Sequence, residues 1–307
     1  MLLVHPFIDS YRTDMADIFK SKKSDASVWF RSLRDNIVAC FESIEQINVS
    51  DTPPGQFEIR ETQRASEDGL DAGGGLMSTM RDGRVFEKVG VNISTVFGVL
   101  GDQAQEAMAS RKGLPGMVED PRFWASGISL VAHMQNPHCP AVHMNTRMFW
   151  TPEAWWFGGG SDLNPCIEYP DDTAQFHSVL AAHCAPHGAS LYPRYKAWAD
   201  NYFYLPHRKR ARGVGGIFYD DHCTGDWEKD FAFTKDVGRA FLPAYMPLVK
   251  ARLGQSWDAV DRETQLIHRG LYAEYNLLYD RGTRFGLETG HDPDAVLMSL
   301  PPLAKWI

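Results

Sequence analysis

Polar side chains that suit proton transfer and carboxylate binding occur in two consecutive apolar-rich runs of the sequence. They are Ser129, His133, His143, Asn145 and Arg147. An imidazole exchanges protons near neutral pH, and a guanidinium group binds a carboxylate through two parallel hydrogen bonds. A single histidine in such a run is usually a core residue hydrogen-bonded to the backbone, but a group of this composition is not. The pattern therefore predicts an active-site surface.

The two runs are predicted to form adjacent strands, Phe123–Met134 and Ala141–Thr151. Pro137 and Pro140 lie between them and mark the connection, because a proline cannot donate a backbone hydrogen bond within a sheet. Side chains along a strand alternate between its two faces. The polar residues of each run therefore share a face, whereas Thr146 points the other way.

Metal binding is the other use of histidine that the sequence leaves open. The chain contains 11 histidines, without a His-x-His, a His-Glu-x-x-His or a Cys/His cluster at zinc spacing. Those that could meet only through the tertiary structure are His133, His143, His177 and His207. The sequence favours a site without metal, with a divalent metal as the alternative.

Charged and glycine-rich motifs come after the hairpin. Trp155–Asp162 holds consecutive glycines without the spacing of a phosphate loop, and we expect these to come after a short strand and let the backbone approach a large flat ligand. The basic run His207–Arg212 precedes a predicted strand that ends in Asp220 and Asp221. These aspartates could act as a base or accept hydrogen bonds from N–H groups. Tight turns and solvated surface are the alternative explanations.

The composition excludes several classes of protein. A net charge of -8 over 307 residues argues against nucleic-acid and membrane-surface binding, which need a basic face. The 5 cysteines are scattered and lack Cys-x-x-Cys pairs, which fits a reducing compartment. No apolar run is long enough for a transmembrane segment, and the first residues resemble neither a secretory signal nor a transit peptide. We therefore expect a cytoplasmic protein.

The order of predicted elements, with strands first and helices later, favours an α+β fold with a large, mostly antiparallel sheet. Residues 1–307 are expected to form one domain. Outside the central hairpin, the predicted elements include a helix at 25–47, a Gly-rich loop at 66–75, a helix at 227–253 broken or kinked at Pro243 and Pro247, and a strand at 271–279.

Motifs from about residue 57 to the C-terminus resemble those of oxygen-dependent coproporphyrinogen-III oxidases. So many separated blocks in the family's order are difficult to obtain by chance, although residues 1–56, a predicted helical lead-in, match less well. The blocks include Gly73–Gly75, Val85–Lys88, Gly127–His133, His143–Arg147, Trp155–Gly160, Tyr192–Tyr195, Arg212–Asp221, Asp280–Thr283 and Leu297–Pro302.

The resemblance implies a homodimer whose large antiparallel sheet is flanked by helices on both sides. It implies an oxidoreductase of heme biosynthesis that converts two propionates of coproporphyrinogen III to vinyls, giving protoporphyrinogen IX. Molecular oxygen would be the co-substrate, without an organic cofactor. Several bacterial members are described as binding a divalent metal through the four histidines above. By the family motif His143 is the proton donor, and substrate contacts come from Ser129, Asn145, Thr146, Arg147 and the loop at Gly290.

An acidic chain must gather arginines locally to bind a substrate with four carboxylates. We expect Arg212 and Arg281 to contact the substrate, and Asp220 or Asp221 to accept pyrrole N–H hydrogen bonds or a proton. A metal oxygenase and a tetrapyrrole carrier without chemistry are the alternatives. The full set of candidate arginines is Arg147, Arg208, Arg210, Arg212, Arg281 and Arg284.

Three positions depart from the family pattern. Arg210 stands where Glu is usual, and Asn164 replaces Thr in Asp-Leu-Thr-Pro. Gly290-His291-Asp292 replaces Gly-Gly-Arg or a similar sequence, in the loop where a substrate contact is expected.

Overall fold

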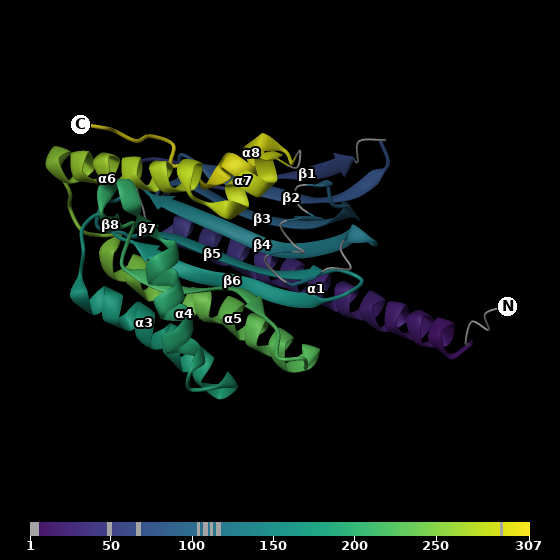
Figure 1. The fold of residues 1–307 in the computed structure, drawn as a ribbon. Coiled ribbons are helices and arrows are strands. Elements are labelled where there is room, and N and C mark those ends of the chain that lie inside the picture. The colour runs from purple at the N-terminus through teal and green to yellow at the C-terminus, as the bar shows by residue number, and fades with distance from the viewer. Residues whose placement is uncertain are drawn as a thin grey trace.

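The chain folds around a seven-stranded antiparallel sheet in the order β1-β2-β3-β4-β5-β6-β9 (Figure 1). The computed structural model describes residues 6–47, 51–65, 69–102, 105–106, 110, 113–114, 118–288 and 291–307. The strands of the sheet are β1 (Glu58–Ala65), β2 (Asp71–Arg81), β3 (Phe86–Val99), β4 (Arg122–Met134), β5 (Ala141–Trp150), β6 (Trp155–Asn164) and β9 (Gly215–His222). A two-stranded ribbon joins β7 (Tyr204–Leu205) to β8 (Arg210–Ala211).

Helices cover both faces of this sheet, so the predicted α+β architecture is confirmed. On one face α1 (Pro6–Ile47) and α5 (Trp227–Arg252) pack against the strands around the main hydrophobic core. On the other face lie α6 (Ala259–Leu278) and the C-terminal segment, where the ring of Tyr272 meets His133. The other helical segments are α3 (Pro170–Cys184), η2 (Ala185–His187), α4 (Leu191–Tyr202), η3 (Pro206–Arg208), α7 (Arg281–Glu288), α8 (Pro293–Val296) and η4 (Leu297–Ser299).

Figure 1 shows α6, α7 and α8 together beside the strands, with α1 passing behind the sheet. None of the helices in the described ranges is both long enough and apolar enough to cross a bilayer.

Two predictions of helix extent were wrong. α1 begins at Pro6, well before the predicted start near residue 25; its first turns project beyond the strands in Figure 1, and proline suits the first turn of a helix. The segment 271–279, predicted as a strand, is the second half of α6. There Tyr272 and Tyr275 are buried three residues apart, which is the spacing of one helix face.

The helix predicted at 227–253 was expected to break or kink at its prolines, and α5 does not break at either of them. The helix continues through Pro243 and Pro247. Both prolines are exposed and lie four residues apart, on the solvent side of the helix. Water can therefore hydrogen-bond to the carbonyls that the missing N–H groups leave free.

The two glycine runs lie within strands rather than in loops. Gly73–Gly75 belongs to β2, and Gly158–Gly160 belongs to β6. Gly73 has a φ of 95°, which side-chain-bearing residues rarely adopt. Glycine weakens a strand, so its concentration in β6 indicates that neighbouring groups need the space.

Candidate active site

The polar residues of the central hairpin share one face of the sheet, as predicted. In the pairing of β4 with β5, Ser129 lies opposite Asn145 and Val131 lies opposite His143. Directly opposite residues of an antiparallel pair project to the same side. Because α1 and α5 fill the other side, this face is left for α6, the end of α4 and the C-terminal segment.

His143 is held on this face between a carboxylate and an amide. Its Nδ1 lies 2.8 Å from Oδ1 of Asp162, and its Nε2 lies 3.2 Å from Nδ2 of Asn145. The NH2 group of Asn145 can only donate, so this network places the proton of a neutral imidazole on Nδ1, where it donates to Asp162. Nε2 is then the atom that can take up a proton and return it.

Asp162 and Arg212 form a buried ion pair behind His143. Nη2 of Arg212 donates to Oδ2 of Asp162 at 2.7 Å, and each side chain is 2% exposed. Burial alone would raise the pKa of Asp162, but the charge of Arg212 and the hydrogen bond from His143 lower it to about 2. The carboxylate therefore stays ionised and orients the imidazole at neutral pH.

Arg212 was expected to contact substrate, but its guanidinium is enclosed. It lies 4.4 Å from the ring centre of Phe203 and 4.5 Å from those of Tyr272 and Tyr275. Cation–π contacts with three rings and an ion pair with Asp162 leave little room for a ligand carboxylate. Its position assigns Arg212 to holding Asp162 in place.

A second group of charges lies nearer the surface, around Asp220. The guanidinium of Arg147 forms a short ion pair with one oxygen of Asp220, and Nη2 of Arg281 lies 3.4 Å from the other. The Arg147 and Asp220 side chains are 34% and 21% exposed, so a ligand can reach them. A Cβ atom at Gly158 would lie 2.9 Å from the guanidinium of Arg147, which explains why β6 carries a glycine there.

The remaining predicted site residues do not join these two groups. Thr146 is fully buried on the opposite face, so only its backbone lies near the site. Asp221 projects away from Asp220 and lies 4.0 Å from Arg194 of α4. Gly290 lies outside the described residues.

The four histidines considered for a metal lie in separate surroundings. Nε2 of His133 is 2.9 Å from the carbonyl of Ser299, and burial lowers the pKa of this imidazole to about 3. His177 contacts Tyr192 and the backbone of Val214, while His207 pairs with Glu274. Within the described ranges no group of three His, Cys, Asp or Glu side chains converges as metal ligands would. The four imidazoles therefore have separate partners in this structure, and a divalent metal stays the alternative to a metal-free site.

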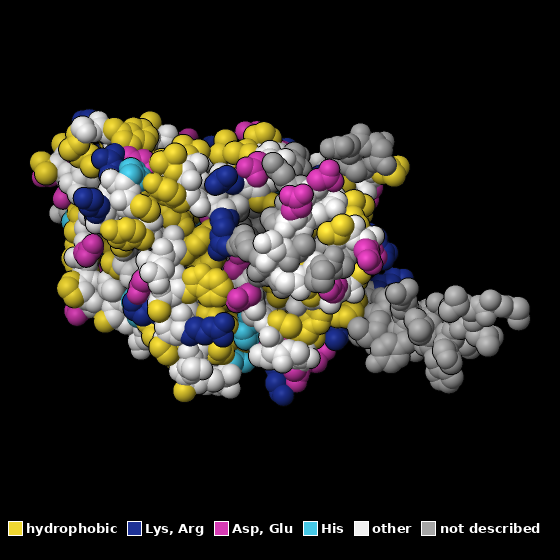
Figure 2. Space-filling view, in the orientation of Figure 1, with side chains coloured by type: hydrophobic (Ala, Val, Ile, Leu, Met, Phe, Trp, Pro, Cys, Tyr) yellow, Lys and Arg dark blue, Asp and Glu magenta, His cyan; other side chains and the backbone are white. Residues whose placement is uncertain are grey.

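Basic side chains also gather at the surface. Figure 2 shows dark-blue side chains along the middle of the viewed face, below α7. In the basic run, Arg208 and His207 both pair with Glu274 of α6.

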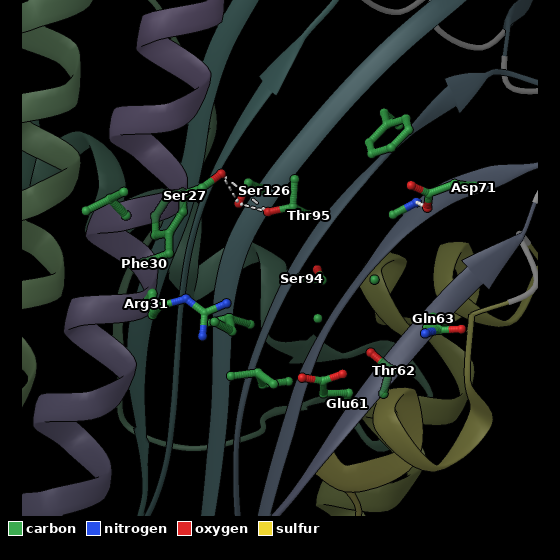
Figure 3. A pocket seen from close by; sticks show the side chains of 17 residues that line it. Ser27, Phe30, Arg31, Glu61, Thr62, Gln63, Asp71, Ser94, Thr95 and Ser126 are labelled. Atoms are coloured by element: carbon green, nitrogen blue, oxygen red, sulfur yellow. Dashed lines mark hydrogen bonds between the residues drawn. The ribbon is translucent and has the colours of Figure 1, made fainter.

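A cavity of about 510 Å³ lies between α1 and β1–β3 on the opposite face of the sheet. Figure 3 shows the hydroxyls of Ser27, Thr95 and Ser126 joined at one side of it. It is lined by residues other than those predicted for the site.

Asp162 is the functional candidate that the sequence prediction missed. Ending the strand before Gly158 left Asp162 in a loop, whereas β6 runs on and places it opposite His143. Continuing the alternation through the glycines would have revealed this pairing, because Asp162 comes after Gly158 and Gly160 on the same face.

Fold and site together define an α+β enzyme with a histidine–carboxylate pair and a group of arginines suited to an acidic ligand. The family model described as Coproporphyrinogen III oxidase matches residues 25–307, and the chain belongs to this family. It is 48% identical over 289 residues to the oxygen-dependent coproporphyrinogen-III oxidase of Rickettsia bellii (strain RML369-C), covering 94% of this chain and 99% of the relative. It is 47% identical over 286 residues to that of Rickettsia peacockii (strain Rustic), covering 92% and 98%.

Proposed function

We propose that this chain catalyses the oxygen-dependent oxidative decarboxylation of two propionates of coproporphyrinogen III, giving protoporphyrinogen IX for heme biosynthesis. Membership of the family and the names of its relatives support the reaction. The observation that carries the proposal is the arrangement of His143, Arg147 and Asp220 on one accessible sheet face. It combines a proton-exchanging group, a carboxylate-binding group and an acceptor for N–H donors.

Substrate binding requires a local basic surface on this acidic protein. Arg147 and Arg281 are the arginines that flank the accessible carboxylate of Asp220. We assign them to the propionates, with Ser129 and Asn145 as polar contacts beside them. Asp220 rather than Asp221 is the acceptor for the pyrrole N–H groups, because only Asp220 shares the face with His143.

In the reaction each propionate loses carbon dioxide and one β-hydrogen, and two electrons pass to dioxygen. The electron-rich pyrrole reacts with dioxygen itself, so no organic cofactor or metal is included in this scheme. A hydrogen bond from the pyrrole N–H to Asp220 increases the electron density of the ring and promotes peroxide formation on it. The peroxide takes the β-hydrogen as the C–CO2 bond breaks and leaves, with one further proton, as hydrogen peroxide. His143 is the group placed to supply that proton.

We further propose that the protein acts in the cytoplasm as a homodimer and binds no nucleic acid. The scattered cysteines support a reducing compartment, and the net charge of -8 opposes binding along a nucleic-acid backbone. Sedimentation of the purified protein tests the dimer directly.

The decisive experiment is aerobic turnover of coproporphyrinogen III by purified protein of known metal content, measured as porphyrin fluorescence after oxidation. We expect turnover that survives a chelator and stops without oxygen. Loss of turnover with chelator would refute the metal-free scheme. Binding of the tetrapyrrole without oxygen uptake would refute the oxidase and leave a carrier.

A further inference from the structure

A small interior cavity lies beside the active site, between the end of β6 and α6. Its volume is about 20 Å³, and Asn164, His268 and Arg269 contribute to its lining. One water molecule needs roughly 10–15 Å³ of such volume. The cavity is therefore large enough for one water and too small for an organic ligand.

Each of these three residues carries a buried polar atom that has no hydrogen-bond partner among the described residues. The atoms are Oδ1 of Asn164, Nε2 of His268 and Nη1 of Arg269. The Asn164 and Arg269 side chains are almost fully buried, with 1% and 4% exposure. A buried polar group without a partner costs about 1–3 kcal/mol, so three in one cavity indicate a shared partner.

The chemistry of the lining selects a neutral partner that both donates and accepts. Nη1 of Arg269 can only donate and Oδ1 of Asn164 can only accept. Burial lowers the pKa of His268 to about 4, so its ring is neutral at pH 7. Nη2 of Arg269 pairs with Oε2 of Glu87 at 2.8 Å, and Glu87 also pairs with Arg262, so Nη1 of Arg269 is the donor that remains for the cavity. An anion without a proton could not donate to Oδ1 of Asn164. Water meets these requirements with the usual number of hydrogen bonds.

We propose that one buried water molecule joins Asn164, His268 and Arg269, and that this water positions the carboxylate partner of His143. Nδ2 of Asn164 donates to Oδ2 of Asp162 at 2.7 Å. The water holds the other end of the same amide and prevents it from turning away from Asp162. Asn164 and His268 are then positioning residues, and this role rests on the proposed function, although the water site itself does not.

A crystal structure at a resolution that shows ordered water tests the site without any assay of activity. We expect a single peak about 2.7–3.2 Å from Oδ1 of Asn164, Nε2 of His268 and Nη1 of Arg269. An empty cavity, or one closed by movement of these side chains onto one another, would overturn the proposal.

The positioning role is tested by replacing His268 with leucine and, as the conservative variant, with glutamine. We expect His268→Leu to lengthen the Asn164–Asp162 contact in a crystal structure and to lower kcat about tenfold at unchanged KM, because small displacements of a catalytic group are costly. The glutamine of His268→Gln can still form a hydrogen bond with the water, so this variant should keep the wild-type Asn164–Asp162 contact and the wild-type kcat.

The control is His183→Leu, since His183 contacts the carbonyl of Val179 within its own helix, α3. Unchanged kcat and an unchanged Asn164–Asp162 distance in His268→Leu would overturn the positioning role. If that variant fails to fold, the wild-type density decides the water site. A wild-type protein that binds the water but does not turn over coproporphyrinogen III would contradict the proposed function and not the site.

Discussion

Replacing Arg212 with methionine should destabilise the protein strongly, although Arg212 was expected from the sequence to contact substrate. The guanidinium lies among Phe203, Tyr272 and Tyr275 and pairs with Asp162, and it is almost fully buried. Methionine fills much of the volume but leaves Asp162 as a buried charge without its cation. Removing one partner of a buried pair costs about 3–5 kcal/mol, and we expect a loss of this size in the free energy of unfolding at pH 7.

The pKa of Asp162 fixes the pH dependence of this loss. Burial alone would raise that pKa, but the charge of Arg212 and the hydrogen bond from His143 lower it to about 2, against an ordinary 3.8. A carboxyl group with a lowered pKa stabilises the fold above its unfolded pKa and loses this contribution as the pH falls through its folded pKa. The difference in the free energy of unfolding between wild type and Arg212→Met should therefore be largest at pH 7 and should decrease between about pH 4 and pH 2.

Urea unfolding at several pH values, together with steady-state kinetics, distinguishes the two roles of Arg212. The control is Arg122→Met, because Arg122 is 65% exposed and pairs with Asp120 on the surface, where such pairs contribute at most about 1 kcal/mol. If Arg212 contacted a propionate, Arg212→Met would raise KM and leave stability close to that of the control. That result would refute the enclosed, positioning role.

Further substitutions test the group of charges around Asp220 and the buried carboxylate of Glu45. Gly158→Ala should lower kcat/KM at least tenfold with little loss of stability, because the added Cβ displaces the guanidinium of Arg147. An unchanged kcat/KM would contradict the assignment of Arg147 to the substrate. Asp220→Asn should abolish most turnover while Asp221→Asn retains it, and equal effects in the same fluorescence assay would remove the distinction between them. Glu45→Gln should lower the free energy of unfolding in urea by about 2–4 kcal/mol. The buried carboxylate of Glu45 accepts four backbone N–H groups, and an amide cannot accept them all. A loss below about 1 kcal/mol would contradict this role of Glu45.

The sequence predicted the central hairpin well because several local signals agree there. Alternation of apolar and polar residues, two prolines in the connection and matched strand lengths determine the register of β4 with β5. Since register determines which side chains share a face, the neighbourhood of Ser129, His143, Asn145 and Arg147 could be predicted directly.

The parts that were not predicted depend on contacts between distant segments. Gly158 lies in a strand although glycine is a poor strand former, because Arg147 of the neighbouring strand occupies the space above it. The rings that enclose Arg212 include two from α6, some 60 residues further along the chain. No local pattern shows that one arginine of a basic run will be buried while Arg208 stays exposed.

The two charge groups differ in a way that bears on catalysis. Arg212 and Asp162 are enclosed and matched, so their geometry is fixed and they keep His143 in one orientation. Arg147 and Asp220 are partly exposed, so a substrate carboxylate can compete for the guanidinium. Once a propionate occupies Arg147, the Asp220 oxygen that it held becomes available to a pyrrole N–H. Under the proposed function, binding of the acidic side chain and polarisation of the ring that carries it are therefore coupled through one ion pair.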